Sequence, residues 1–119
     1  MNLPLASAVD RLISMPGEAL HASHVIDLEV AQTLRKLVRA RAIDAVRGEE
    51  ALTDFAALNI QRHEHLPLLS RIWELRDNLT AYDAAYVALA EVLNAPLLTC
   101  DAKLARSPGH SAKITLIST

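Results

Sequence analysis

Three acidic side chains lie in sequence surroundings where a carboxylate is costly unless it has a partner. Glu29 lies between Leu28 and Val30, and Asp83 lies within an alanine-rich run. Asp101 directly follows PLLTC, a short apolar segment. A poorly solvated carboxylate is destabilising unless it is paired or binds a cation. Three such groups could converge on Mg²⁺, which prefers oxygen ligands and keeps waters that can attack a phosphodiester.

Each of the three acids also has a purely structural explanation. Asp101 could cap the helix that follows it. Asp83 falls in the first turn of its expected helix, where an acid favours the helix dipole. Glu29 could pair with Arg35 or Lys36. Spacing alone does not decide between these explanations and a shared cation site.

Two further groups contain residue types that could do chemistry. His63 and His65 flank an acid in RHEH, which could bind zinc, but no third ligand stands nearby, so a surface turn is favoured. Cys100 belongs to the apolar PLLTC run, which indicates a buried structural thiol rather than a nucleophile. The sequence has no recognisable motif of a Ser-His-Asp catalytic triad and no glycine-rich phosphate-binding loop.

The elements that must position the acids are mostly helices. Apolar periodicity and turn residues predict helices near 5–13, 23–40, 51–58, 67–75 and 80–94, and strands near 19–22, 60, 96–100 and 113–117. Pro16-Gly17 ends the first helix, Ser23 can cap the second with Leu28 facing inward, and Gly48 separates the second helix from the third. Helices alternating with short strands predict an α/β fold with a mainly parallel sheet, and Asp101 would lie at a strand tip.

Length and composition predict one ordered domain over residues 1–119. Hydrophobic residues make up 51% and charged residues 22% of the chain, which excludes global disorder. The net charge of −2 excludes a generally basic nucleic-acid-binding surface, although not a local basic patch. One cysteine fits a reducing compartment, and no apolar run approaches the ~20 residues of a membrane span. No signal peptide is recognisable, so the cytoplasm is the expected location.

Two segments resemble a known family. WELRDNLTAYDAAYVALAEVLNAPLLTCDAKLA, residues 73–105, resembles the C-terminal half of a PIN domain of the VapC toxin type. The matching residues are Asn78, Thr80, Tyr82, Asp83, Ala84, Tyr86, Leu89, Ala90, Glu91, Thr99 and Asp101. HASHVIDLEVAQTLRKLV, residues 21–38, is similar to the first acidic helix of that family, with Glu29 as the matching acid.

The resemblance implies a PIN-like α/β fold and a metal-dependent endoribonuclease toxin. Glu29, Asp83 and Asp101 would then be the catalytic acids that bind Mg²⁺ or Mn²⁺, and Thr99 would orient a carboxylate or a water. A metal-activated water would cleave RNA phosphodiesters. The resemblance also implies a small antitoxin encoded beside the toxin, and a homodimer.

A cluster of cations could contact the RNA backbone. The candidates are Arg35, Lys36, Arg39, Arg41 and Arg76. A solvated charged face is the structural alternative for these residues.

The N-terminal segment departs from the family pattern. The family begins with a central strand that ends in D-A-S and supplies the first metal-binding Asp, whereas MNLPLASAVDRLIS resembles the helix that follows that strand. Asp10 is expected to point away from the other acids. The sequence therefore predicts an N-terminally incomplete PIN-like domain, through a misplaced translation start, a truncation or a degenerate gene. The alternative function is a catalytically impaired binding module that retains an antitoxin or another partner.

Overall fold

The structure is a computed structural model that describes residues 9–15, 17 and 19–117 of the chain. The chain divides into two compact units. The first unit contains the segment up to Asp10 and Val25–Asn59, and the second contains Arg11–His24 and Ile60–Thr119. All strands in the described ranges lie in the second unit.

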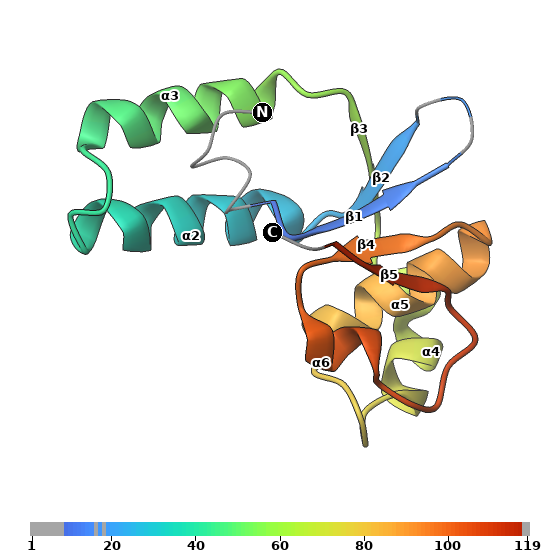
Figure 1. Cartoon of the computed structure of the whole chain (residues 1–119). Coiled ribbons are helices and arrows are strands. Elements are labelled where there is room, and N and C mark those ends of the chain that lie inside the picture. Colours follow the sequence, from blue (N-terminus) through green and yellow to red (C-terminus); the bar gives the residue numbers. More distant parts are fainter. Residues whose placement is uncertain (1–8, 16, 18, 118–119) are drawn as a thin grey trace. The chain divides into compact units, whose positions relative to one another are not determined.

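The second unit is built on a five-stranded sheet of order β3-β2-β1-β4-β5 (Figure 1). The strands are β1 (Arg11–Ser14), β2 (Leu20–Ser23), β3 (Ile60–His63), β4 (Leu97–Thr99) and β5 (Ile114–Leu116). Strands β2 and β3 are parallel, as are β4 and β5, whereas β1 runs antiparallel to both of its neighbours. Four of the five strands therefore share one direction, and the predicted α/β fold with a mainly parallel sheet is confirmed.

Strand β1 corrects the helix predicted near 5–13. Residues 1–8 lie outside the described residues, but Arg11–Ser14 is a strand in the middle of the sheet. Its backbone pairs with β2 on one side and β4 on the other, and the Ile13 side chain is fully buried. Pairing on both sides satisfies more backbone groups than a short helix would, and this tertiary context overrides the helical pattern of the sequence.

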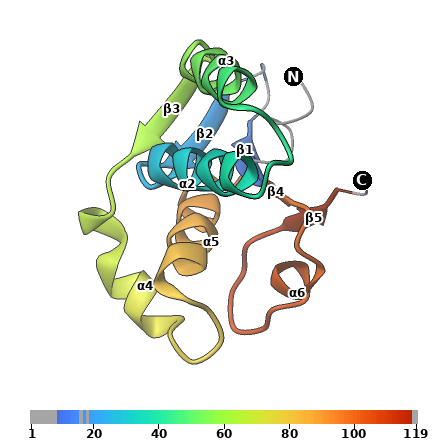
Figure 2. The ribbon, with the colours of Figure 1, turned by 90° about the vertical axis from the view of Figure 1, so that its left-hand side faces the viewer.

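Helix α5 (Ala81–Leu93) covers one face of the sheet. It contacts β1, β2 and β4, and α4 (Leu69–Glu74) packs against it (Figure 2). Every residue of Ala84–Ala90 is buried, as expected for a helix that is apolar all round. Thr80 caps its start and Asn94, in the left-handed conformation with φ 51°, ends it, so the helix predicted over 80–94 is confirmed.

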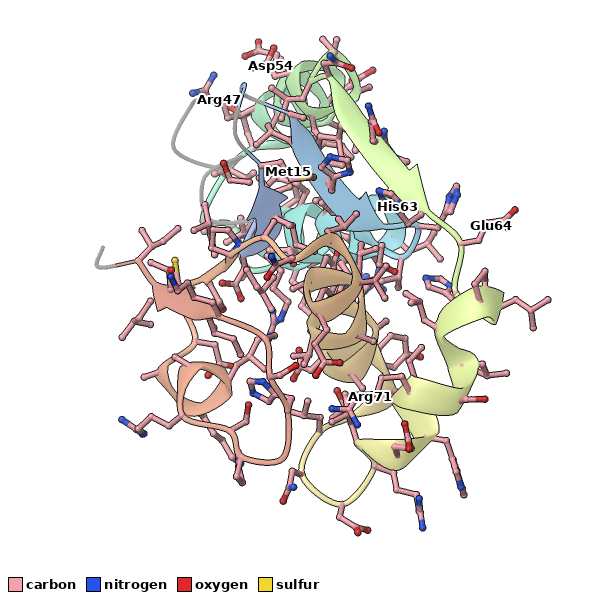
Figure 3. All side chains as sticks on the ribbon, turned by 90° about the vertical axis from the view of Figure 1, so that its right-hand side faces the viewer. Met15, Arg47, Asp54, His63, Glu64 and Arg71 are labelled. Carbon is pink, nitrogen blue, oxygen red and sulfur yellow. The ribbon has the colours of Figure 1, made fainter. Side chains whose placement is uncertain are left out.

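The helix predicted near Pro67 is split into η1 (Leu66–Leu68) and α4. Arg71 of α4 donates to both carboxylate oxygens of Glu91 on α5, each at 2.8 Å, and Figure 3 shows Arg71 beside α5. Across the chain ranges that the structure describes, no helix is long and apolar enough to cross a membrane.

The first unit contains α2 (Ile26–Arg39) and α3 (Ala45–Ala56), which pack against each other. Ile26, Val30 and Leu34 form the buried stripe of α2, four residues apart. Leu28 was predicted to face inward, but its side chain is 73% exposed, so the buried face is rotated from the predicted one.

Two predicted boundaries in this region are also wrong. Ser23 is the last residue of β2 rather than a helix cap, because its side chain is buried and bonded to His65. Gly48 lies inside α3, whose cap is Asp44, so it does not separate the two helices.

Candidate functional site

Asp83 and Asp101 meet at the side chain of Arg11 in the second unit. The Arg11 Nε lies 2.8 Å from Asp83 Oδ1, and its Nη2 lies 3.3 Å from Asp101 Oδ2. The side chains of Arg11, Asp83 and Asp101 are 17%, 24% and 37% exposed, so the group is partly shielded from water and still accessible. Partial shielding strengthens the attraction between these charges relative to a fully solvated ion pair.

Asp83 is positioned by the start of α5. It stands in the first turn, where Thr80 Oγ1 accepts a hydrogen bond from the Asp83 backbone N–H at 3.2 Å. This cap fixes the helix start, and the positive end of the helix dipole favours a carboxylate there. The structural explanation for Asp83 therefore holds, and its carboxylate also faces a second side chain, Arg11.

Asp101 is positioned by the end of β4 and the start of α6 (Ala102–Ala105). Its Oδ1 accepts the backbone N–H groups of Lys103 and Leu104, at 2.9 and 3.2 Å. The fully buried Thr99 accepts the Asp101 backbone N–H on its Oγ1 at 3.0 Å. One carboxylate oxygen of Asp101 thus caps a helix, while the other faces Arg11.

Arg11 is the site residue that sequence reasoning missed. It is the first residue of β1 and pairs with Thr99, the last residue of β4. Because β1 runs antiparallel to β4, the start of β1 lies at the carboxyl end of β4, the edge where polar sites gather in α/β sheets. Predicting this needed both the strand and its register, since Arg11 and Asp101 are ninety positions apart.

The Asp83 and Asp101 carboxylates suit a cation. They are hard oxygen donors that already face one positive group, and the guanidinium of Arg11 stands where a cation would be held between them. Within either unit, the described residues contain no group of three His, Cys, Asp or Glu side chains suited to a metal ion. Two carboxylates and waters are enough for Mg²⁺, provided that Arg11 moves away.

Glu29 belongs to the other unit, in the first turn of α2. Its side chain is half-buried, and its neighbour Val30 is buried while Leu28 is exposed. Of the two apolar neighbours of Glu29 in the sequence, only Val30 therefore lies in buried, apolar surroundings. Its convergence with Asp83 and Asp101 stays a prediction.

The candidate RNA-contacting cations are exposed in both units. Arg35, Lys36 and Arg39 lie on the C-terminal half of α2, where cations also complement the helix dipole. Arg41 follows that helix in the left-handed conformation, with φ 60°. Arg76 follows α4 in the other unit, and its guanidinium lies 4.7 Å from the centre of the Trp73 ring.

The histidines of RHEH are paired rather than free on a turn. His63 Nε2 lies 2.7 Å from His21 Nδ1, and His65 Nε2 lies 2.5 Å from Ser23 Oγ. Burial lowers the pKa of His63, and the neighbouring charges of His21 and His24 lower it further. These pairs join β2 to the end of β3 and to the segment that follows it.

Cys100 is exposed, which corrects the buried thiol predicted from the PLLTC run. The strand ends at Thr99, and Cys100 lies in the bend between β4 and α6. The alternation along the strand buries Leu97 and Thr99, so the next residue, Cys100, falls on the opposite side and is exposed.

Comparison with known proteins places these residues in a family. The sequence profile of the PIN domain matches residues 2–109. The chain is 42% identical over 101 residues to ribonuclease VapC9 of Mycobacterium tuberculosis (strain ATCC 25618 / H37Rv), which covers 85% of this chain and 80% of that protein. It is 38% identical over 118 residues to ribonuclease VapC12 of the same strain, covering 99% of this chain and 90% of that protein.

A third relative, ribonuclease VapC1 of the same strain, is 42% identical over 98 residues, which covers 82% of this chain and 74% of that protein. The profile match and the three relatives agree with the α/β sheet described above, and Asp83 and Asp101 fall within the matched range. The chain belongs to the PIN domain family, and its relatives include VapC ribonucleases.

Proposed function

We propose that this chain is an endoribonuclease of the VapC toxin type. The observation that carries the proposal is the meeting of Asp83 and Asp101, the two acids of the C-terminal motif, at the carboxyl end of β4. Similarity to proteins named VapC ribonucleases supports the substrate class. Glu29, on α2, is the third proposed acid.

Each residue of the proposed site has a distinct task. Asp83 and Asp101 would hold a divalent cation, and each has one carboxylate oxygen that faces Arg11. Thr99 fixes the backbone of Asp101, and the cap of α6 immobilises its other oxygen. When bound, Mg²⁺ or Mn²⁺ supplies an activated water and positive charge for phosphodiester hydrolysis. Arg35, Lys36, Arg39, Arg41 and Arg76 are proposed to contact the RNA backbone.

The proposal includes a cytoplasmic location and two protein partners, a small antitoxin and a second copy of the chain. Exposed apolar side chains support such protein contacts. Leu66, Leu69 and Trp73, on η1 and α4, are 78%, 54% and 67% exposed. Large exposed apolar groups close together are typical of protein interaction surfaces. Light scattering of the purified chain, alone and with the product of the adjacent gene, tests both partners.

A catalytically impaired binding module is the second candidate function. The observation in its favour is the pairing of Arg11 with both aspartates, which neutralises charge that a cation would otherwise use. Such a module would bind the antitoxin or another protein and leave RNA intact.

An RNA cleavage assay separates the two functions. End-labelled RNAs and matched DNAs are incubated with the purified chain in Mn²⁺, in Mg²⁺ and in excess chelator. The ribonuclease proposal predicts discrete RNA products in either metal, and intact RNA in chelator. Intact RNA in every condition, from a chain that is folded by circular dichroism, would leave the binding module as the function.

A further inference from the structure

We infer that Arg11 competes with the divalent cation for the Asp83–Asp101 pair. The structure shows one guanidinium within ion-pair distance of both carboxylates, at 2.8 and 3.3 Å. The inference concerns how the cation gains entry, and it rests on the proposed cation site. It assigns Arg11 the role of a competitor inside the chain.

The geometry explains why Arg11 and a cation would compete for the pair. The same two oxygens, Asp83 Oδ1 and Asp101 Oδ2, face Arg11, and Asp101 Oδ1 is occupied by two backbone N–H groups. A divalent ion bridging the pair would lie close to a positive charge in a partly shielded site, where repulsion is strong. Cation binding therefore requires the Arg11 side chain to leave its partners.

The place of Arg11 in the fold holds it against the pair. It is half-buried on the central strand, and its neighbour on β4 is the fully buried Thr99. An arginine anchored on a central strand loses less conformational freedom when it forms ion pairs than one on a loop would. One of the two negative charges of the pair is consequently already balanced, and the apparent cation affinity includes the free energy of displacing Arg11.

Direct metal binding tests this inference without RNA. Mn²⁺ is titrated into the full chain, in 0.15 M salt to screen remote charges, and free Mn²⁺ is followed by electron paramagnetic resonance. Arg11→Gln removes the charge, and Arg106→Gln is the matched control, because Arg106 is exposed at the end of α6 in the same unit. The inference predicts that Arg11→Gln binds Mn²⁺ about tenfold more tightly or better, and that Arg106→Gln binds like the parent.

Arg11→Lys gives an intermediate case. An ammonium is a single point charge that does not span two carboxylates as a guanidinium does. Its Mn²⁺ affinity is therefore expected between those of the parent and Arg11→Gln. Equal affinity in the parent and a folded Arg11→Gln, or no binding by that variant, would overturn the inference.

The parent chain provides a second measurement, which decides the matter if Arg11→Gln does not fold. Nuclear magnetic resonance follows the Arg11 Nε–H signal and the Asp83 and Asp101 carboxyl carbons as Mg²⁺ is added. The inference predicts that all three signals shift together. Carboxyl signals that shift while the Nε–H signal stays fixed would overturn it, and so would signals that never move, because a group that is never displaced is not a competitor.

The binding readout also separates this inference from the proposed function. If the chain fails to cleave RNA but Arg11→Gln still binds Mn²⁺ more tightly, only the ribonuclease proposal fails. If RNA is cleaved and the two affinities are equal, only the role of Arg11 is wrong.

Discussion

At the scale of single residues, the second unit depends on two arginines that each bind carboxylates from other elements. Arg71 forms a bidentate pair with Glu91, and Arg11 joins Asp83 to Asp101. The pKa of Glu91 is lowered to about 2, mainly by hydrogen bonds from Arg71 and also by hydrogen bonds from Ser111. Glu91 thereby fastens both α4 and the segment before β5 to α5.

The Glu91 pair predicts how stability depends on pH. The pKa of Glu91 is about 2 in the folded chain and 4.5 as the reference value, so the unfolded state binds a proton more readily. The ionised Glu91 therefore contributes fully to the free energy of unfolding above pH 4.5. This contribution is lost as the pH falls towards about 2. Glu91→Gln is expected to lower the free energy of unfolding at pH 7 by about 1–2 kcal/mol, allowing for the partial exposure of Arg71.

Urea unfolding at pH 7 and pH 3 measures this effect. The control is Glu74→Gln, because Glu74 also lies near Arg71 but at 3.6 Å, with its side chain 65% exposed. The control should change stability by less than about 0.5 kcal/mol. An unchanged free energy of unfolding in Glu91→Gln at pH 7 would contradict the account.

The sequence predicted part of the candidate site at this scale. Asp83, Thr99 and Asp101 could be found because each belongs to a local motif, and Asp101 follows an apolar strand. Arg11 could not be found, since its role depends on a strand register that joins residues ninety positions apart. Cys100 was misplaced because its exposure depends on where β4 ends, which local hydropathy does not show.

At the scale of elements, α2 and α3 approach closely at Gly48. A Cβ atom at this position would lie 2.8 Å from Val38 Cγ2, which is shorter than a normal contact. Valine is stiff at χ1, so Val38 cannot turn away at little cost. The helical hairpin therefore needs glycine near the start of α3 despite its low helix propensity.

Gly48→Ala is expected to lower the free energy of unfolding by about 1 kcal/mol, because overpacking outweighs the gain in helix propensity. The matched background is Val38→Ala, which removes the methyl group that the new Cβ would meet. In that background, Gly48→Ala should be stabilising by roughly 0.5 kcal/mol. Urea unfolding of the four chains measures both effects, and an equal effect of Gly48→Ala in the two backgrounds would refute the close approach.

Helices α2 and α5 were largely predictable, because long apolar patterns are strong local signals, whereas α3 begins at Ala45, before its predicted start near residue 51, and the helix predicted near Pro67 is split. Thr80 and Asn94 mark the ends of α5 in the sequence and in the structure. β1 was not predictable, because its residues also fit a helical pattern and only pairing with β2 and β4 makes them a strand. The buried face of α2 also differs from the predicted one, because tertiary packing decides which of its apolar residues are buried.

At the scale of the whole molecule, the predicted α/β class holds, while the central strand β1 and its antiparallel direction were not foreseen. Local patterns give the other four strands but neither β1 nor the strand order, and an antiparallel β1 changes which residue reaches the carboxyl edge of β4. An arginine therefore stands beside the two aspartates. The central proposal is that a cation displaces Arg11 and is held by these aspartates, and that the resulting site cleaves RNA.

The cleavage rate of an end-labelled RNA at saturating Mn²⁺ tests this claim most directly. Asp83→Asn and Asp101→Asn keep the size of each side chain, and asparagine also caps a helix as well as aspartate does. Asp77→Asn is the matched control, since Asp77 is exposed between α4 and α5. The account predicts that each of the first two variants cleaves about a hundredfold more slowly or worse, while the control matches the parent. Rates within about twofold of the parent for either folded site variant would contradict it.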